Sequence, residues 1–149
     1  MDFIPGIKST LVQLKAEFDI IKTERPIKSR QDAEGYFKIE TTVPCLIMNT
    51  NKGYYALIIS GERQKLDFKQ IQKELGFAKF DLAERKEVKN NLSLDPGRIP
   101  LIGHNLPTII DNWIFKHEYV YGGTGDFNHT LKIKPKDLEK ALNVEFKFD

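Results

Sequence analysis

Cysteine is nearly absent from this chain: its 149 residues include only Cys45, together with three histidines. A single cysteine excludes an internal disulfide. The histidines and the scattered carboxylates show no spacing typical of a metal site. We therefore predict that the protein uses neither a metal nor another cofactor.

Long apolar runs and a strong net charge are also missing. No stretch approaches the ~18 residues that span a bilayer, and the opening MDFIPGIKST lacks the regions of a signal peptide. These absences predict a cytoplasmic protein that does not act on a membrane. The net charge of +2 is too small by itself to indicate a nucleic-acid partner.

The residues that are present describe an ordinary folded protein, 40% hydrophobic and 30% charged. The length suits a single domain over residues 1–149 with a real core. Apolar periodicity, caps and turn residues then predict the elements. The expected helices cover 7–18, 29–36, 67–76, 88–92 and 135–142, and the expected strands cover 19–23, 45–48, 54–60, 77–82, 108–111, 118–121 and 144–148.

We expect these elements to form an α/β fold. Its sheet should be mixed and largely antiparallel, could close into a barrel, and should be surrounded by helices. Residues 45–48 and 54–59 should pair as a hairpin because Gly53 supplies a turn residue between them. We also expect the strands near 108–111 and 118–121 to share one sheet.

The stretch 95–133 concentrates turn and loop residues, with five of the ten glycines, three of the seven prolines and all three histidines. Pro96-Gly97 has the form of a type II turn. Gly103, Gly122 and Gly123 lie next to strand-like runs, where backbone without side chains lets a ligand or a second chain segment approach. The alternative is that these glycines only make hairpin turns.

Within this stretch, LPTIID and YVYGGTGDFNHTLKIKPKDL resemble the YbaK/prolyl-tRNA-editing superfamily of aminoacyl-tRNA deacylases. DPGRIPLIG is similar to the glycine-proline loop of that family. YYALIISGERQKLDFKQIQKELG is similar to its strand, charged turn and following helix. The resemblance covers residues 8–146. It implies a YbaK-like fold and a free-standing protein that deacylates mischarged tRNA carrying a small amino acid such as Ala, Cys, Ser or Thr. It also implies tRNA as the partner, with an aminoacyl-tRNA synthetase as a further candidate.

The resemblance also indicates which residues to expect at the site. Ester hydrolysis needs a positioned water and donors for a developing oxyanion, which backbone N–H groups of a glycine loop can supply. We expect Gly97 and Asp111 to be catalytic, although an aspartate at a strand end can equally cap a turn. The expected substrate-binding residues are Cys45, Pro100, Gly103, His104, Gly122, Gly123, His129 and Thr130. Surface positions are the alternative for both histidines.

One position departs from the family pattern. Most relatives open the hairpin with lysine and threonine, where this chain has Pro44 and Cys45. Proline carries neither a charge nor a backbone donor. A binding module without catalysis is therefore an alternative function, and hydrolysis of another small ester is a third. Cys45 would act as a nucleophile only with a nearby base or cation. Otherwise it is a small core residue.

Residues 65–89 are rich in basic side chains, although acidic ones interleave with them. A mixed region of this kind is usually a solvated face. The other interpretation is a docking surface for the acceptor stem of tRNA, through phosphate contacts that carry no sequence information. The sequence leaves the amino acid, the tRNA and the oligomeric state open.

Overall fold

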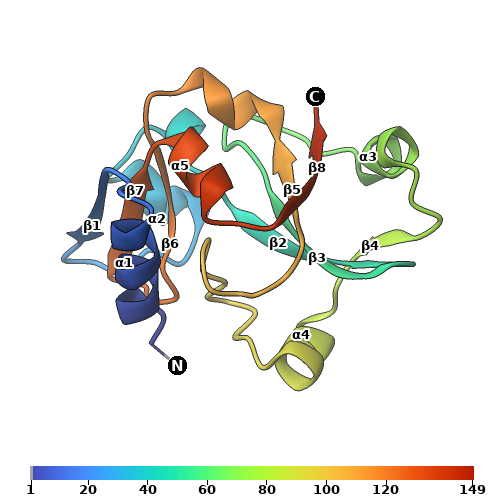
Figure 1. Cartoon of the computed structure of the whole chain (residues 1–149), viewed down its shortest axis with the longest axis horizontal. Helices are drawn as coiled ribbons and strands as arrows, with labels where there is room; N and C mark the ends of the chain where they lie inside the picture. The colour runs from blue at the N-terminus through green and yellow to red at the C-terminus, as the bar shows by residue number, and fades with distance from the viewer. Residues whose placement is uncertain (1) are drawn as a thin grey trace.

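The computed structural model describes residues 2–149, whose strands form two sheets packed against each other (Figure 1). The smaller sheet has the order β1-β7-β6 and the larger has the order β4-β2-β3-β5-β8. The strands are β1 (Phe18–Lys22), β2 (Cys45–Thr50), β3 (Gly53–Ile58), β4 (Phe80–Leu82), β5 (Thr108–Asp111), β6 (Val120–Gly123), β7 (His129–Ile133) and β8 (Val144–Phe148).

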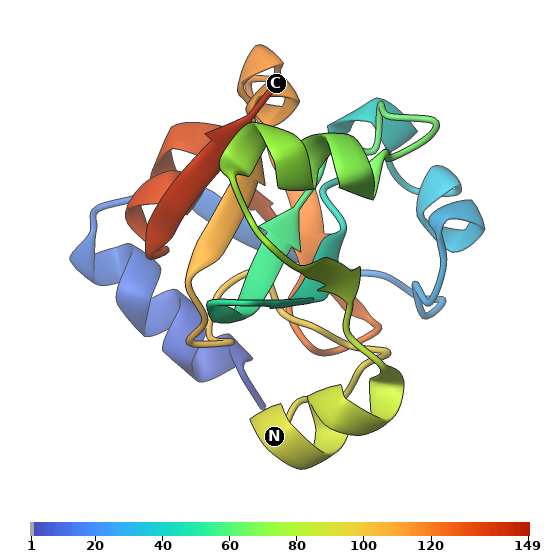
Figure 2. The same cartoon turned by 90° about the vertical axis from the view of Figure 1, so that its right-hand side faces the viewer.

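Helices and short 3₁₀ turns surround the sheets (Figures 1 and 2). They are α1 (Ile4–Gln13), α2 (Arg30–Glu34), η1 (Ile39–Thr41), α3 (Phe68–Leu75), α4 (Arg85–Leu92), η2 (Asn112–Lys116) and α5 (Pro135–Lys140). Within residues 2–149, none of these helices combines the length and the apolar character needed to cross a bilayer.

The predicted mixed α/β fold is confirmed, and so is the hairpin, in which Cys45 pairs with Ile58 and Thr50 with Gly53. Most strand pairs are antiparallel, while β3-β5 and β5-β8 are parallel.

The suggested closure of the sheet into a barrel is wrong. Among residues 2–149, the two sheets stay separate, and β6 meets the segment that precedes β2 at an isolated bridge between Thr42 and Tyr121. The expectation that 108–111 and 118–121 share a sheet is wrong for the same reason. β5 takes β3 and β8 as neighbours, whereas β6 pairs with β7.

The central strand β3 is buried on both faces, as its continuous apolar sequence predicts. Tyr55 and Leu57 face the cluster beneath α3, together with Ile109 of β5. Ile58 faces the opposite way, into the cluster shared with α1 and the smaller sheet. Ala56 packs with Val88 of α4. The larger sheet is therefore the middle layer, with α3 packed on one face and the smaller sheet on the other.

Two boundaries near the amino-terminal helix differ from those that the sequence predicted. The spacing predicted one helix through Leu14 and Phe18, but α1 ends at Gln13. Leu14 is 40% exposed, and Phe18 begins β1. The backbone of Lys15 turns to a positive φ of 56°, which cannot continue a right-handed helix and separates the two elements.

Candidate functional site

A cavity of about 440 Å³ opens where the smaller sheet meets the start of β2. Its size lies within the range of pockets that bind small molecules. Its walls come from the segment leading into α2, the loop 96–99, and the adjoining ends of β6 and β7. Six of the residues expected at the site line it: Cys45, Gly97, Gly122, Gly123, His129 and Thr130.

The glycines of β6 allow a second chain segment to cross the strand. The N–H of Leu101 donates to the carbonyl of Gly123 at 3.0 Å. A Cβ on Gly122 would overlap the side chain of Leu101, at 2.7 Å from its Cγ, and would lie 3.1 Å from Cγ2 of Val43. A Cβ on Gly123 would lie 3.0 Å from the carbonyl oxygen of Ile99. The loop after Gly97 can therefore lie directly on β6 and form one wall of the cavity.

Gly122→Ala is expected to destabilise the fold by about 1–3 kcal/mol, because Leu101 is fully buried and has no room to withdraw. Gly6→Ala is the matched control. Gly6 lies in α1 with no neighbour within 4 Å of an added Cβ, so alanine there should stabilise by up to about 1 kcal/mol. Urea unfolding of both variants checks the pair, and equal effects would contradict the close crossing.

The turn at Pro96-Gly97 differs from the predicted type II form. Arg98 N–H does donate to the carbonyl of Asp95 at 2.9 Å, but Gly97 lacks the positive φ that a type II turn needs. The side chain of Asp95 accounts for the difference, because its Oδ1 accepts the Gly97 N–H at 2.9 Å. This bond and the guanidinium of Arg98, 2.9 Å away, lower the pKa of Asp95. The Gly97 N–H is thus already engaged.

Pro44 and Cys45 lie together in the cavity wall. Pro44 is exposed there, and its carbonyl accepts the N–H of Ile59 at 3.1 Å. Cys45 packs against two apolar clusters, and burial raises the pKa of its thiol to about 12. A thiol with that pKa stays protonated at neutral pH, so Cys45 has the character of a small wall residue and not of a nucleophile.

His129 sits at the start of β7, where it lines the cavity beside Asp126. Its Nδ1 lies 3.2 Å from Oδ2 of Asp126, a close polar contact without the alignment of a hydrogen bond. The N–H of Asn128 donates to Oδ1 of Asp126 at 2.8 Å and, with His129 nearby, lowers the pKa of this carboxyl. The hydroxyl of Thr124 donates to the His129 carbonyl at 2.9 Å. A carboxylate that stays ionised can hold the Nδ1–H form of the imidazole and leave Nε2 as a base.

Cations and aromatic rings border the same cavity. Lys28 Nζ and Arg98 Cζ lie 5.2 and 5.3 Å from the ring centroid of Phe127. Phe37 stacks on Tyr121 with centroids 4.6 Å apart. Neither these residues nor Asp126 could be predicted as part of a site from the sequence. Only the His129–Asp126 spacing offered a signal, and two polar residues three apart are too common in loops to indicate a site.

Four expected site residues lie outside the cavity: Pro100, Gly103, His104 and Asp111. Pro100 is buried where the loop continues toward Leu101. Gly103, with a φ of 108°, packs against the ring of Phe3. His104 is 6% exposed, and its Nδ1 accepts the N–H of Leu106 at 3.0 Å. Burial lowers the pKa of His104 to about 4, so it is neutral at physiological pH.

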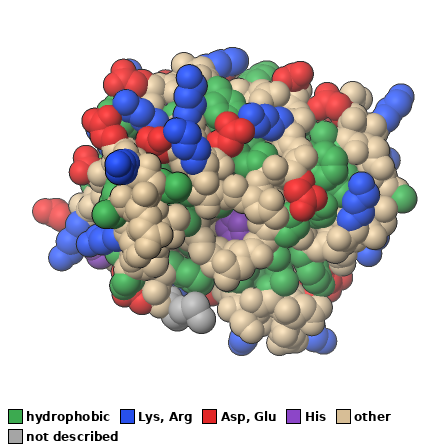
Figure 3. Space-filling model, viewed as in Figure 1, with side chains coloured by type: hydrophobic (Ala, Val, Ile, Leu, Met, Phe, Trp, Pro, Cys, Tyr) green, Lys and Arg blue, Asp and Glu red, His purple; other side chains and the backbone are tan. Residues whose placement is uncertain are grey.

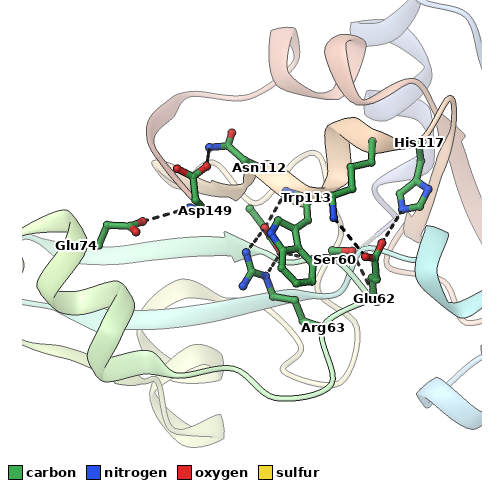
Figure 4. Close-up of polar contacts among 10 residues, drawn as sticks. Ser60, Glu62, Arg63, Glu74, Asn112, Trp113, His117 and Asp149 are labelled. Carbon is green, nitrogen blue, oxygen red and sulfur yellow. Dashed lines mark hydrogen bonds and ion pairs between the residues drawn. The ribbon is translucent and has the colours of Figure 1, made fainter.

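Asp111 is fully buried at the end of β5, where its carboxylate binds the turn after β3. Oδ2 accepts the N–H of Ser60 at 2.9 Å and Nε of Arg63 at 2.6 Å. Oδ1 accepts Nη2 of Arg63 at 2.8 Å and the N–H of Trp113 at 2.9 Å. Figure 4 shows Arg63 beside Trp113, and its Cζ lies 4.0 Å from the indole ring centroid. These contacts give Asp111 the turn-capping role that the sequence left open.

No group of three or more His, Cys, Asp or Glu side chains among residues 2–149 is arranged to hold a metal ion. The cavity brings together the His129–Asp126 pair, the bordering cations and the backbone of the loop 96–99.

Comparisons with known proteins bear on the family and the fold. The family model for the aminoacyl-tRNA editing domain matches residues 24–141. The crystal structure of the hypothetical protein APE2540 is similar over 95% of this chain and 96% of its own, with a TM-score of 0.81 and 21% identity. A candidate trans-editing enzyme for prolyl-tRNA synthetase is similar over 96% of this chain and 91% of its own, with a TM-score of 0.76 and 20% identity.

A candidate signal transduction protein from Marinobacter aquaeolei VT8 is also similar, with a TM-score of 0.65 and 16% identity. The match covers 94% of this chain but 29% of that longer protein. Because every identity is below 25%, these structures support the shared fold alone.

Proposed function

The chain belongs to the aminoacyl-tRNA editing domain family, and from this premise we propose that it hydrolyses the ester of mischarged aminoacyl-tRNA. It would act in trans, the role named for the similar candidate trans-editing enzyme. The observation that carries the proposal is the cavity, where a histidine–carboxylate pair faces a glycine-bearing loop across β6. The products are a free amino acid and a tRNA with its terminal ribose restored.

The cavity suits a small aminoacyl group attached to a ribose. Its volume of about 440 Å³ leaves room for more than an amino acid, so part of the terminal nucleoside can enter as well. Gly122 and Gly123 present no side chains to the cavity, and the backbone carbonyl of Ile99 lies close against Gly123. We propose substrates carrying alanine, cysteine, serine or threonine. A pocket separates such residues from larger ones by exclusion better than by affinity, since one methylene is worth only ~1–3 kcal/mol.

His129 is the proposed general base. It takes a proton from a water molecule as the water oxygen attacks the ester carbonyl carbon, while Asp126 holds the imidazole and stabilises its positive charge. The tetrahedral intermediate then collapses, the bond to the ribose oxygen breaks, and the proton passes to that leaving oxygen. The cations around the cavity stabilise the developing negative charge.

The family lysine has candidate replacements on other elements. Lys28 and Arg98 approach Phe127 at the cavity, and Arg30 lines it from the start of α2. An ammonium or guanidinium there can hold a substrate phosphate as the missing lysine would. We propose that these side chains partly compensate for Pro44.

A binding module without catalysis is the second candidate. Two observations favour it: Pro44 carries no charge at the cavity wall, and the Gly97 N–H already donates to Asp95 and not toward a substrate. Such a protein would hold the aminoacylated end of a tRNA and leave the ester intact.

Single-turnover release of amino acid at saturating protein separates the two candidates. The substrates are tRNAs carrying alanine, cysteine, serine, threonine or proline. Release above the rate without protein supports the hydrolase, and Gly97→Val should lower this release because it adds a side chain at the cavity wall. Gly97 is exposed, and a Cβ there would meet no atom closer than 3.5 Å, so this variant should fold. Binding without release would leave only the binding module. If neither binding nor release were found, both candidate functions would be discarded.

Pro44→Lys is expected to tighten substrate binding by about two- to fivefold, the usual worth of one partly solvated charge contact. The release rate at saturation should change little. Ile59 keeps its hydrogen bond, because lysine retains the accepting carbonyl at position 44. Gln13→Lys adds the same charge at the exposed end of α1 and should leave both quantities unchanged. A large gain in release rate for Pro44→Lys would instead indicate that the family lysine stabilises the transition state.

A further inference from the structure

A second cavity, of about 680 Å³, adjoins the first and shares Pro96, Arg98 and Gly125 with it. We call it the basic groove. Its cations are Arg85, Lys86, Lys89 and Arg98, and its one carboxylate is Asp95. Asp95 is already paired with Arg98 at 2.9 Å. The remaining three cations all come from α4.

The basic side chains of α4 lie on a different face of the helix from Val88 and Glu87. Val88 is buried against the larger sheet, and Glu87 accepts a hydrogen bond from the Asn49 amide at 3.1 Å, on the strand β2. Its basic residues line the groove instead. Among residues 2–149, no carboxylate lies within ion-pair distance of Lys86 or Lys89, and both are exposed.

This separation of basic from acidic side chains is confined to α4 and the groove. Figure 3 shows that basic and acidic side chains alternate over the face seen in Figure 1, without a large patch of one sign. The whole chain carries a net charge of only +2. Unpaired cations at the groove therefore concentrate positive potential beside the cavity, in a way that the average charge conceals.

We propose that the basic groove binds the phosphodiester backbone of a single-stranded RNA end whose terminal ribose enters the first cavity. This inference rests on the proposed function, because the ester places the 3′ nucleoside in that cavity. The groove continues directly from it through Arg98, so the preceding phosphates would follow the basic face of α4. Arg85 and Lys89 lie one helical turn apart, about 6 Å along the axis, and can contact successive phosphates. Contacts of this type position a strand without reading its sequence.

Charge reversal at the groove tests the proposal. The variant is Lys86→Glu with Lys89→Glu, and the control is Lys136→Glu with Lys140→Glu. The control lysines are exposed on α5 and line neither cavity. Figures 1 and 2 show that the helix α5 lies well apart from α4. Both variants change the net charge equally. Urea unfolding verifies that both are folded.

The first measurement is the affinity for uncharged tRNA as a function of salt. Loss of two phosphate contacts should reduce the slope of log affinity against log salt by about 1 to 2 for the groove variant alone. The second measurement is hydrolysis. The groove variant should raise KM about tenfold for aminoacyl-tRNA, and much less for aminoacyl-adenosine, which lacks the phosphates.

Equal slopes for the two variants, or an equal rise in KM for both substrates, would contradict RNA binding at the basic groove. The proposed function can fail independently. If the natural protein hydrolyses neither substrate, the reaction is wrong, while a slope change confined to Lys86 and Lys89 still supports the groove. If hydrolysis is found and the slope is unchanged, the reaction stands and the groove is discarded.

Discussion

Asp111→Ala is expected to destabilise the fold by about 3–5 kcal/mol, the cost of leaving one partner of a buried ion pair alone. Arg63 would keep its charge with a side chain only 15% exposed, held between the rings of Trp113 and Phe148. The N–H groups of Ser60 and Trp113 would lose their acceptor at the same time. Urea or guanidinium unfolding measures the loss.

Two further variants make this result specific. Asp81→Ala removes an exposed carboxylate from β4 and should change stability by less than about 0.5 kcal/mol. Replacing Arg63 and Asp111 together by leucine should cost less than the sum of the two single changes, since neither charge is then left unpaired. A loss below about 1 kcal/mol for Asp111→Ala would contradict the capping role. Normal hydrolysis by its folded fraction would separate this role from catalysis.

The elements that the sequence predicted well depend on contacts a few residues apart. Ser29 accepts the Asp32 N–H at 3.2 Å, and Asp67 accepts the Gln70 N–H at 3.1 Å, as their capping patterns indicated. Gly76 ends α3 with a φ of 77°. The partner of each strand in a sheet is set by residues far away in the chain. For this reason the separation of β5 and β6 into two sheets could not be predicted.

The same distinction applies to the site. Gly122, His129 and Thr130 belong to one short stretch with a specific pattern, and the structure brings them to one cavity. The environment of Asp111 depends on Arg63, 48 residues earlier, and nothing in the sequence around either residue indicates that they meet. The basic region 65–89 stayed open between a solvated face and a docking surface for tRNA for a related reason. Lys86 and its neighbours alternate with acidic residues in the sequence, and only the folded helix separates the two signs.

His129→Ala is expected to slow single-turnover release of the amino acid by about 10²-fold or more, because the proposed general base is lost. Asp126→Asn should slow it less, since the imidazole remains at the cavity without its ionised partner.

His117→Ala is the matched control for this last prediction. His117 lies 3.6 Å from Glu62 and does not line the cavity, so its loss should leave the release rate unchanged. Affinity for aminoacyl-tRNA should persist in His129→Ala, because a general base acts in the transition state more than in the bound complex. Weakened binding with an unchanged release rate would make His129 a substrate contact. If His129→Ala changed neither the affinity nor the release rate, His129 would not belong to the site. The substrate itself would then have to activate the water.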